Sequence, residues 1–343
     1  MNLAKIFNIL EYFDKKGVGV NIITNGQFDK SIVEKITNYS CISNISVSID
    51  GNELENNFIR GNGSYCKAIN FLNNLVTLKR FNLKVGINLT LNKLNYKSLE
   101  LKEMIDLGID YILINRIIEN GRAKKELILN DDEYLDGIEK ICIELNEFVR
   151  NGKICFEEEN PLLLSYLNLK FNLSIPIKNS SCGAGKSVFY MDNQSNIYPC
   201  REIKETIDIN KENITKYAYL LEKGVENSNP FCSNCEYVDE CFQCPMKEHN
   251  RYKECEKVFQ RLESFLRGLE GEKYKLNNNA IMLETSSELK FYDIVSNEEC
   301  SVPICKSVVE SINNDVFVCN DDLSTNDMII SLYNRGILIN EGT

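Results

Sequence analysis

The sequence of 343 residues contains a single histidine, His249, and no tryptophan. One imidazole excludes a His-rich metal site, and any Ser-His-Asp or Cys-His catalysis would have to use His249. No apolar run approaches the roughly 18–20 residues that a membrane-spanning helix needs. The N-terminal residues include Glu11 and Asp14 and lack the apolar core of a secretory signal. We therefore expect a cytoplasmic protein that binds no membrane.

Positive charge is also scarce in this sequence. The chain has 39 Lys and Arg residues against 50 Asp and Glu residues, which gives a formal net charge of −11. Binding to phosphate backbones needs a basic surface, so a general nucleic-acid binder is excluded. Hydrophobic residues make up 43% of the chain, which excludes a disordered protein, and the length allows two or three domains with a buried core.

Helical and strand periodicities alternate over residues 1–170. The patterns predict helices over 3–13, 29–39 and 132–150 and after Ser64 (a candidate N-cap) and Ser98, and strands over 20–23, 45–49, 83–91 and 111–114. Strands joined by helices predict an α/β protein with a parallel sheet.

Two of these predicted strands, 45–49 and 83–91, have one apolar and one polar face. Ser46, Ser48 and Asn88 occupy the polar face. Strands covered by helices on both faces are usually apolar throughout. The polar face therefore lines a cavity in a curved sheet or barrel, or it faces solvent at a sheet edge.

The end of the chain shows a second pattern. A helix is expected over 262–269, followed by a polar linker from Gly271 to Asn279. Residues 280–343 predict a small α+β unit. Its expected elements are a hairpin (281–295), a helix after Ser301, a helix capped by Ser324 with Asp327 three residues on and ended by Gly336, and a strand (337–339).

Half of the 14 cysteines lie in one short segment. Cys182 and Cys200 precede a group with the pattern Cys232-x2-Cys235-x5-Cys241-x2-Cys244, and Cys255 follows. In a cytosolic chain of this size, clustered thiols indicate metal ligands more than disulfides. Ligation by cysteine alone suits zinc or an iron–sulfur cluster, and unligated buried thiols are a third alternative.

The order of these cysteines resembles the SPASM domain of radical S-adenosylmethionine enzymes, many of which modify peptides. Ser195 replaces a usual glycine, and the third spacing is two residues instead of three. The resemblance implies two auxiliary [4Fe-4S] clusters. It assigns Cys182, Cys200 and Cys244 to one, with an open fourth iron, and Cys232, Cys235, Cys241 and Cys255 to the other.

The first half of the chain resembles the same family independently. The motifs that carry the resemblance are Thr24-Asn25-Gly26, Ser46 to Gly51, Gly61 to Tyr65, and Gly121-Arg122-Ala123. They correspond in order to the third to sixth strands of a radical S-adenosylmethionine barrel. The resemblance implies a partial (β/α)6 barrel over residues 1–176, a SPASM domain over 177–258 and a C-terminal domain over 259–343. Ser46, Ser48, Asn88 and Arg116 would face the barrel lumen near cofactor and substrate.

The motif that holds the catalytic cluster of this family, Cys-x3-Cys-x2-Cys, does not occur before Cys182. We therefore expect the C-terminal portion of a maturase of a ribosomal peptide or protein, unable by itself to cleave S-adenosylmethionine. Cofactor binding would need the N-terminal part, which a separate chain could supply. The alternative is a non-catalytic iron–sulfur or zinc scaffold or partner protein.

Overall fold

The computed structural model describes residues 3–119, 123–156, 160–177, 183–203, 206, 230–233, 235, 237–241, 251–293, 298–303, 306–313, 316–335 and 337–341. Contacts divide the chain into two compact units, Met1–Glu159 and Asn160–Thr343, which are described separately. The predicted barrel end at residue 176 lies beyond this division, inside the second unit. Among the described residues, no helix is long and apolar enough to cross a lipid bilayer.

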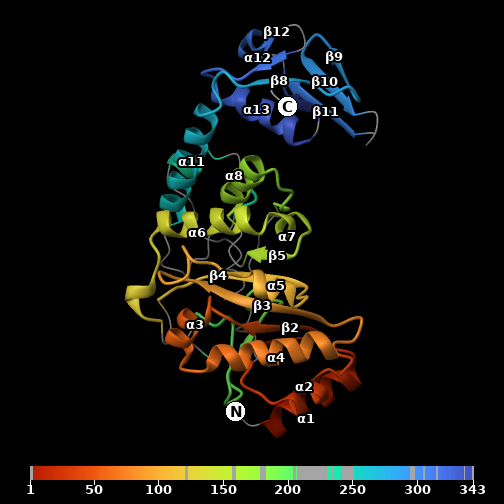
Figure 1. Ribbon diagram of the computed structural model, residues 1–343, viewed down its shortest axis with the longest axis vertical. Helices are drawn as coiled ribbons and strands as arrows, with labels where there is room; N and C mark the ends of the chain where they lie inside the picture. Colours follow the sequence, from red (N-terminus) through yellow and green to blue (C-terminus); the bar gives the residue numbers. More distant parts are fainter. Residues whose placement is uncertain are drawn as a thin grey trace. The chain divides into compact units, whose positions relative to one another are not determined.

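The first unit is built on a five-stranded sheet in the order β1-β2-β3-β4-β5 (Figure 1). Its strands are β1 (Val20–Thr24), β2 (Ile42–Ser48), β3 (Lys84–Leu91), β4 (Tyr111–Arg116) and β5 (Ile154–Phe156). Helix α1 (Leu3–Lys16) precedes β1, and the helices between the strands are α2 (Lys30–Ile36), α3 (Glu53–Arg60), α4 (Ser64–Leu78), α5 (Lys102–Asp106), α6 (Asp131–Glu144) and α7 (Asn146–Arg150). Every strand pair in this sheet is parallel, which confirms the predicted α/β class.

One face of this sheet carries the hydrophobic core of the first unit. Val47, Ile87 and Ile112 align across β2, β3 and β4, and all three are fully buried. Helix α4 packs on β2 and β3 and buries Phe71 and Leu72. Because side chains alternate along a strand, Ser46, Ser48 and Asn88 lie on the opposite face.

Two local predictions in the first unit are wrong. The N-cap of α4 is Gly63, in the left-handed region at φ 73°, and Ser64 makes no capping bond. The hydroxyl of Ser64 instead accepts a hydrogen bond from Asn56 Nδ2 at 2.9 Å. The helix predicted over 132–150 is interrupted at Leu145, between α6 and α7.

The second unit begins with α8 (Pro161–Phe171), which packs against α11 (Arg251–Arg267) and α13 (Leu323–Asn334). A two-stranded sheet of β6 (Tyr190–Met191) and β7 (Ile197–Tyr198) and the short helix α10 (Pro230–Ser233) lie between α8 and α11 in sequence.

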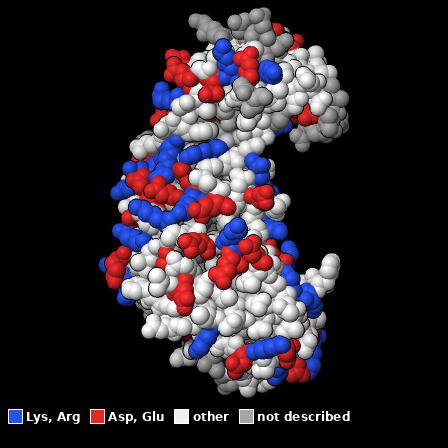
Figure 2. All heavy atoms as spheres, viewed as in Figure 1, with Lys and Arg blue, Asp and Glu red and all other residues white. Residues whose placement is uncertain are grey.

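On the face shown in Figure 2, acidic and basic side chains of the described residues are interspersed.

The C-terminal residues form two small antiparallel sheets. One has the order β12-β13-β8-β14, with β8 (Lys273–Leu276), β12 (Ile312–Asn313), β13 (Val316–Val318) and β14 (Leu338–Asn340). The other has the order β11-β10-β9, with β9 (Ala280–Glu284), β10 (Glu288–Asp293) and β11 (Glu298–Pro303), and α12 (Lys306–Ser311) follows it. The hairpin and the α+β character are as predicted. The prediction of a polar linker over residues 271–279 is wrong. Strand β8 lies within this range and buries Tyr274 against Phe317 and Leu338.

The cap of α13 gives a first test of this structure. Asp322, not the predicted Ser324, is the N-cap, and its carboxylate accepts hydrogen bonds from the Thr325 backbone N–H and from the Thr325 and Ser324 hydroxyls. Hydrogen bonds from the Thr325 hydroxyl foremost, then from the Ser307 side chain, and to a smaller extent from Ser324 and the Thr325 backbone, lower the pKa of Asp322 from its ordinary 3.8 to about 2. A lowered pKa means that the stabilisation is present above about pH 4 and is lost as the pH falls toward 2.

We expect Asp322→Ala to lower the free energy of unfolding of the second unit by about 1 kcal/mol at pH 7. Ser324→Ala leaves the cap carboxylate in place and should cost clearly less. Urea denaturation of the full chain followed by circular dichroism measures both. Equal losses in the two variants would contradict the assignment of the cap.

Candidate functional site

The predicted polar face is built on β2 and β3. Ser46 pairs with Gly86 and Ser48 with Asn88 in the parallel register, and the two serines are buried while Asn88 is half-buried. Ser46 Oγ lies 2.7 Å from the hydroxyl of Tyr111 on β4. Gly86 makes this contact possible, because a Cβ there would come within 2.8 Å of the Tyr111 ring.

The same face continues on β4 through a residue that the sequence did not indicate. Asn115 pairs with Thr90 in the register, and its Nδ2 donates hydrogen bonds to the side-chain oxygen of Asn88 and to the carbonyl of Leu89. Asn115 is half-buried. Amide groups on two neighbouring strands therefore present donors and acceptors on the polar face.

Arg116, the fourth predicted lumen residue, lies on the other face of the sheet. It pairs with Leu91, whose side chain points toward α6. The Arg116 guanidinium donates to Asp131 Oδ1 at 2.7 Å and stacks 4.5 Å above the Tyr134 ring, and both partners belong to α6. The structure thus brings Ser46, Ser48 and Asn88 together and separates Arg116 from them.

A buried carboxylate joins two of the sequence motifs at the carboxyl ends of the strands. Asp50 follows β2, and its carboxylate accepts hydrogen bonds from Thr90 N–H at 3.1 Å and from Arg60 Nε at 2.7 Å. Asn56 binds the backbone N–H of Asp50 at 3.0 Å and the hydroxyl of Ser64 at 2.9 Å. Asp50 therefore positions the end of α3 and the guanidinium of Arg60.

The loop after β1 completes this edge of the sheet. Gly26 adopts φ 66°, and a Cβ there would lie 3.0 Å from Val47 and 3.1 Å from the Ala68 backbone. The Gln27 side chain donates to the carbonyl of Ser64 at 3.1 Å and to that of Asn25 at 3.0 Å. The Thr-Asn-Gly motif and the Gly61–Tyr65 motif are thus joined through the side chain of Gln27.

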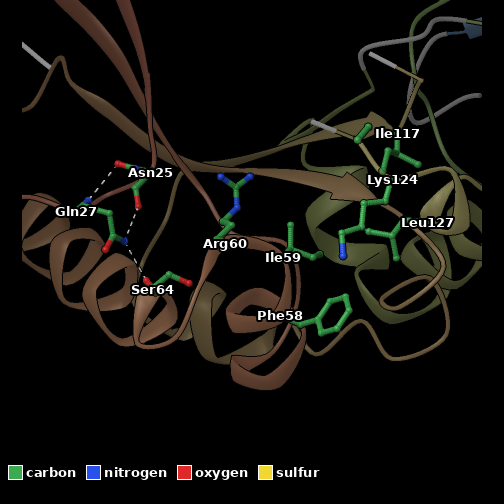
Figure 3. Close-up of a pocket in the computed structure, with 10 residues that line it drawn as sticks. Asn25, Gln27, Phe58, Ile59, Arg60, Ser64, Ile117, Lys124 and Leu127 are labelled. Atoms are coloured by element: carbon green, nitrogen blue, oxygen red, sulfur yellow. Dashed lines mark hydrogen bonds between the residues drawn. The ribbon is translucent and has the colours of Figure 1, made fainter. Parts of the chain in front are cut away.

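These segments enclose a pocket of about 450 Å³ (Figure 3). Asn25, Gln27 and Ser64 lie at one end of it, Phe58 and Lys124 at the other, and Arg60 lies between them. The lining residues are Asn25, Gln27, Phe58, Ile59, Arg60, Ser64, Ile117, Ala123, Lys124 and Leu127. Two cations with polar and apolar neighbours suit a ligand that carries both an anionic group and an apolar part. In α/β proteins with parallel strands, ligands bind at this carboxyl edge.

The predicted metal ligands are only partly described. Cys182 and Cys244 lie outside the described residues. The same holds for His249 and for Gly121 and Arg122 of the Gly121-Arg122-Ala123 motif. Cys200, Cys232, Cys235, Cys241 and Cys255 are within them and form no disulfide. Burial, and then the proximity of Cys241 and Cys235, raises the pKa of the Cys232 thiol. The backbone N–H of Cys235 donates to the carbonyl of Cys232 at 3.1 Å, so these two predicted ligands of one cluster share a turn.

Within the described part of the chain, no three His, Cys, Asp or Glu side chains converge closely enough to hold a metal ion. The donor atoms are nevertheless those that zinc or an iron–sulfur cluster requires, since cysteine thiols are thiolates when bound to a metal. The donor set thus fits a thiolate-ligated group in its chemistry. Cys319, in contrast, is an isolated core residue, and burial raises the pKa of its thiol to about 11.

Comparison with known proteins gives matches to solved structures only. No protein-family model and no curated protein matches the chain. Streptococcus suis SuiB matches over 70% of this chain and 59% of its own, with 18% identity and a TM-score of 0.52. SuiB bound to the precursor peptide SuiA matches with 17% identity and a TM-score of 0.52. Native anSMEcpe with bound AdoMet matches over 70% of this chain and 72% of its own, with 14% identity and a TM-score of 0.50.

These similarities establish that the chain shares its α/β fold with SuiB and anSMEcpe, and that it spans less than two thirds of the SuiB chain. Sequence reasoning had indicated the motifs of the site but missed Arg60 and Asn115. A signal for Arg60 was present, because it directly precedes the Gly61–Tyr65 motif. Asn115 had no comparable signal, since it lies just beyond the predicted strand.

Proposed function

We propose that this chain is the C-terminal portion of a radical S-adenosylmethionine/SPASM enzyme that matures a ribosomal peptide or protein. The observation that carries the proposal is the parallel sheet at whose carboxyl edge one residue from each of three motifs of the resemblance, Asn25, Ser64 and Ala123, lines a single pocket. The shared fold with a structure that contains AdoMet and with one bound to a precursor peptide supports it. A partial (β/α)6 barrel, with a SPASM domain after it, is the corresponding architecture, and a cytoplasmic location remains our prediction.

The proposed cofactor site uses the polar face of the sheet. Ser46, Ser48 and Asn88 would bind the cofactor there. Asn115, which lies on the same face, would replace Arg116 as the fourth residue of the site. S-adenosylmethionine carries hydroxyl groups and a carboxylate, which hydroxyl and amide side chains and a guanidinium can bind. The guanidinium of Arg60, fixed by Asp50, is the side chain of the pocket best suited to the carboxylate.

The proposed metal centres are two auxiliary [4Fe-4S] clusters. Cys182, Cys200 and Cys244 would hold one, and Cys232, Cys235, Cys241 and Cys255 the other. When bound, such a cluster exchanges single electrons, and the one with three protein thiolates leaves an iron open to substrate. The turn that joins Cys232 and Cys235 supports the second assignment.

The proposed partner is a chain segment that supplies the remaining part of the barrel. Among the described strands, β1 pairs only with β2, so its outer edge has unpaired backbone groups. Ile23 on β1 is 59% exposed, and an apolar groove of about 480 Å³ lies between α1, β1 and α2. Exposed apolar strand edges favour pairing with a further strand. A parallel strand added to β1 would cover this groove.

Metal analysis of the anaerobically prepared full chain tests the proposed function. We expect about eight iron and eight sulfide ions per chain, because two [4Fe-4S] clusters contain that number. Cys235→Ser should remove about half of the iron, whereas Cys319→Ser changes a cysteine outside the proposed centres and should leave it unchanged. Stoichiometric zinc without visible absorption would refute the clusters and would favour a zinc-binding scaffold protein instead.

A further inference from the structure

A buried polar cluster connects the start of α8 with α11. Asn160 is the N-cap of α8, and its Oδ1 accepts a hydrogen bond from Leu163 N–H at 3.3 Å. Its Nδ2 donates to Glu254 Oε1 at 2.7 Å and to Cys255 Sγ at 3.5 Å. The exposed fractions of Asn160, Glu254 and Cys255 are 2%, 3% and 8%. A helix cap needs only Oδ1, so the two amide N–H groups serve a second purpose.

The contact between Asn160 and Cys255 suits both forms of the sulfur. A thiol can donate to Asn160 Oδ1, which lies 3.7 Å from Sγ. A thiolate can only accept, and the Nδ2–H of Asn160 is within reach of it. Because an ionised sulfur is a stronger acceptor than a neutral one, the N–H bond gains strength when Cys255 becomes a metal ligand.

Glu254 fixes the orientation of the amide. One proton of Asn160 Nδ2 is directed to the Glu254 carboxylate by the short contact, and the planar amide then directs the other proton toward Cys255. Glu254 and Cys255 are neighbours on α11, so the three side chains form one unit between two helices. This geometry holds the Cys255 sulfur at a defined distance from α8.

We propose that Asn160 is a positioning residue for Cys255 and that it raises the reduction potential of the cluster that Cys255 would help to hold. The N–H dipole directed at the ligand sulfur stabilises the reduced cluster, which carries one more negative charge than the oxidised cluster. The inference rests on the proposed function, because Cys255 must ligate a cluster.

Potentiometric titration of the anaerobically reconstituted full chain, followed by electron paramagnetic resonance, tests this role. Asn160→Ser retains a capping oxygen for Leu163 but has no amide N–H. The matched control is Asn168→Ser, since Asn168 lies near the end of the same helix and binds the backbone N–H and carbonyl of Ile175. We expect Asn160→Ser to lower the midpoint potential of the cluster that Cys235→Ser removes. Asn168→Ser should have the potential of the unchanged protein.

The possible results separate the two proposals. Loss of this cluster in Asn160→Ser but not in Asn168→Ser also supports the positioning role, whereas its loss in both variants overturns it. If the protein without substitutions holds two clusters and the Asn160→Ser variant has the same midpoint potential, this inference alone is overturned. A chain without iron and sulfide overturns the proposed clusters and this inference together.

Discussion

Replacement of Asp50 by alanine should lower the free energy of unfolding of the first unit by about 3 kcal/mol, because a buried carboxylate that binds a charged group and a strand amide is lost. Its side chain accepts hydrogen bonds from Thr90 N–H and Arg60 Nε. Without it, the amide at the end of β3 has no acceptor, and Arg60 is no longer fixed in the pocket. Hydrogen exchange should therefore become faster at the Thr90 amide.

Asp110 provides a matched control for this experiment. Its carboxylate accepts from Val85 N–H at 2.7 Å and from Lys79 Nζ, which is the same combination at the amino end of β3. Asp110→Ala should accelerate exchange at Val85 and leave Thr90 protected. Mass spectrometry or nuclear magnetic resonance of exchanged amides measures both sites. Unchanged protection of Thr90 in Asp50→Ala would refute the role given to Asp50.

The sequence predicted the sheet well because the burial of one face leaves a period of two in the residues. Ile45, Val47 and Ile49 alternate with polar residues, and the structure buries all three. The orientation of the last residues of β4 was harder to predict from the sequence. Which face Asn115 and Arg116 occupy depends on their pairing with Thr90 and Leu91, and one strand alone does not determine that register.

Helix α3 was missed for a different physical reason. Its apolar residues Leu54 and Phe58 are 83% and 64% exposed, so the segment has no buried apolar face from which a helix could be predicted. The helix is fixed instead by a capping box between Asn52 and Glu55 and by the buried amide of Asn56. The partners of Asn56, Asp50 and Ser64, are six and eight positions away, and polar contacts of this kind leave no apolar periodicity in the sequence.

In the candidate metal centre, too, the sequence predicts some features and not others. Spacing alone indicated that Cys232 and Cys235 share one turn, and only the resemblance to the family adds Cys241 and Cys255 to them. The contact of Asn160 with Cys255 joins residues that are 95 positions apart. Such contacts arise only when α8 and α11 pack, so the sequence predicts the ligand types but not the polar groups around them.

Gly26→Ala is the substitution for which we expect the other large effect, a loss of roughly 3 kcal/mol in the stability of the first unit. Part of the cost is the left-handed backbone at φ 66°, which disfavours a side chain by about 1–2 kcal/mol. The remainder is a clash, because the new Cβ would lie 3.0 Å from Val47 and 3.1 Å from Ala68 Cα. The latter is a backbone atom, so relief requires a shift of α4, and overpacking of this kind costs about 1–3 kcal/mol.

Gly17 separates the two contributions, because it has nearly the same φ, 65°, but no atom within 4 Å of an added Cβ. Gly17→Ala should therefore lose only the backbone part, and the difference between the two variants measures the contact of the Thr-Asn-Gly loop with β2 and α4. Urea denaturation gives both stabilities, and exchange of the β2 amides localises the effect. Equal losses in the two variants would mean that the loop can move away from α4. In that case the Thr-Asn-Gly motif would not be held against the sheet by close packing, and the arrangement of Asn25 and Gln27 at the pocket would lose its structural basis.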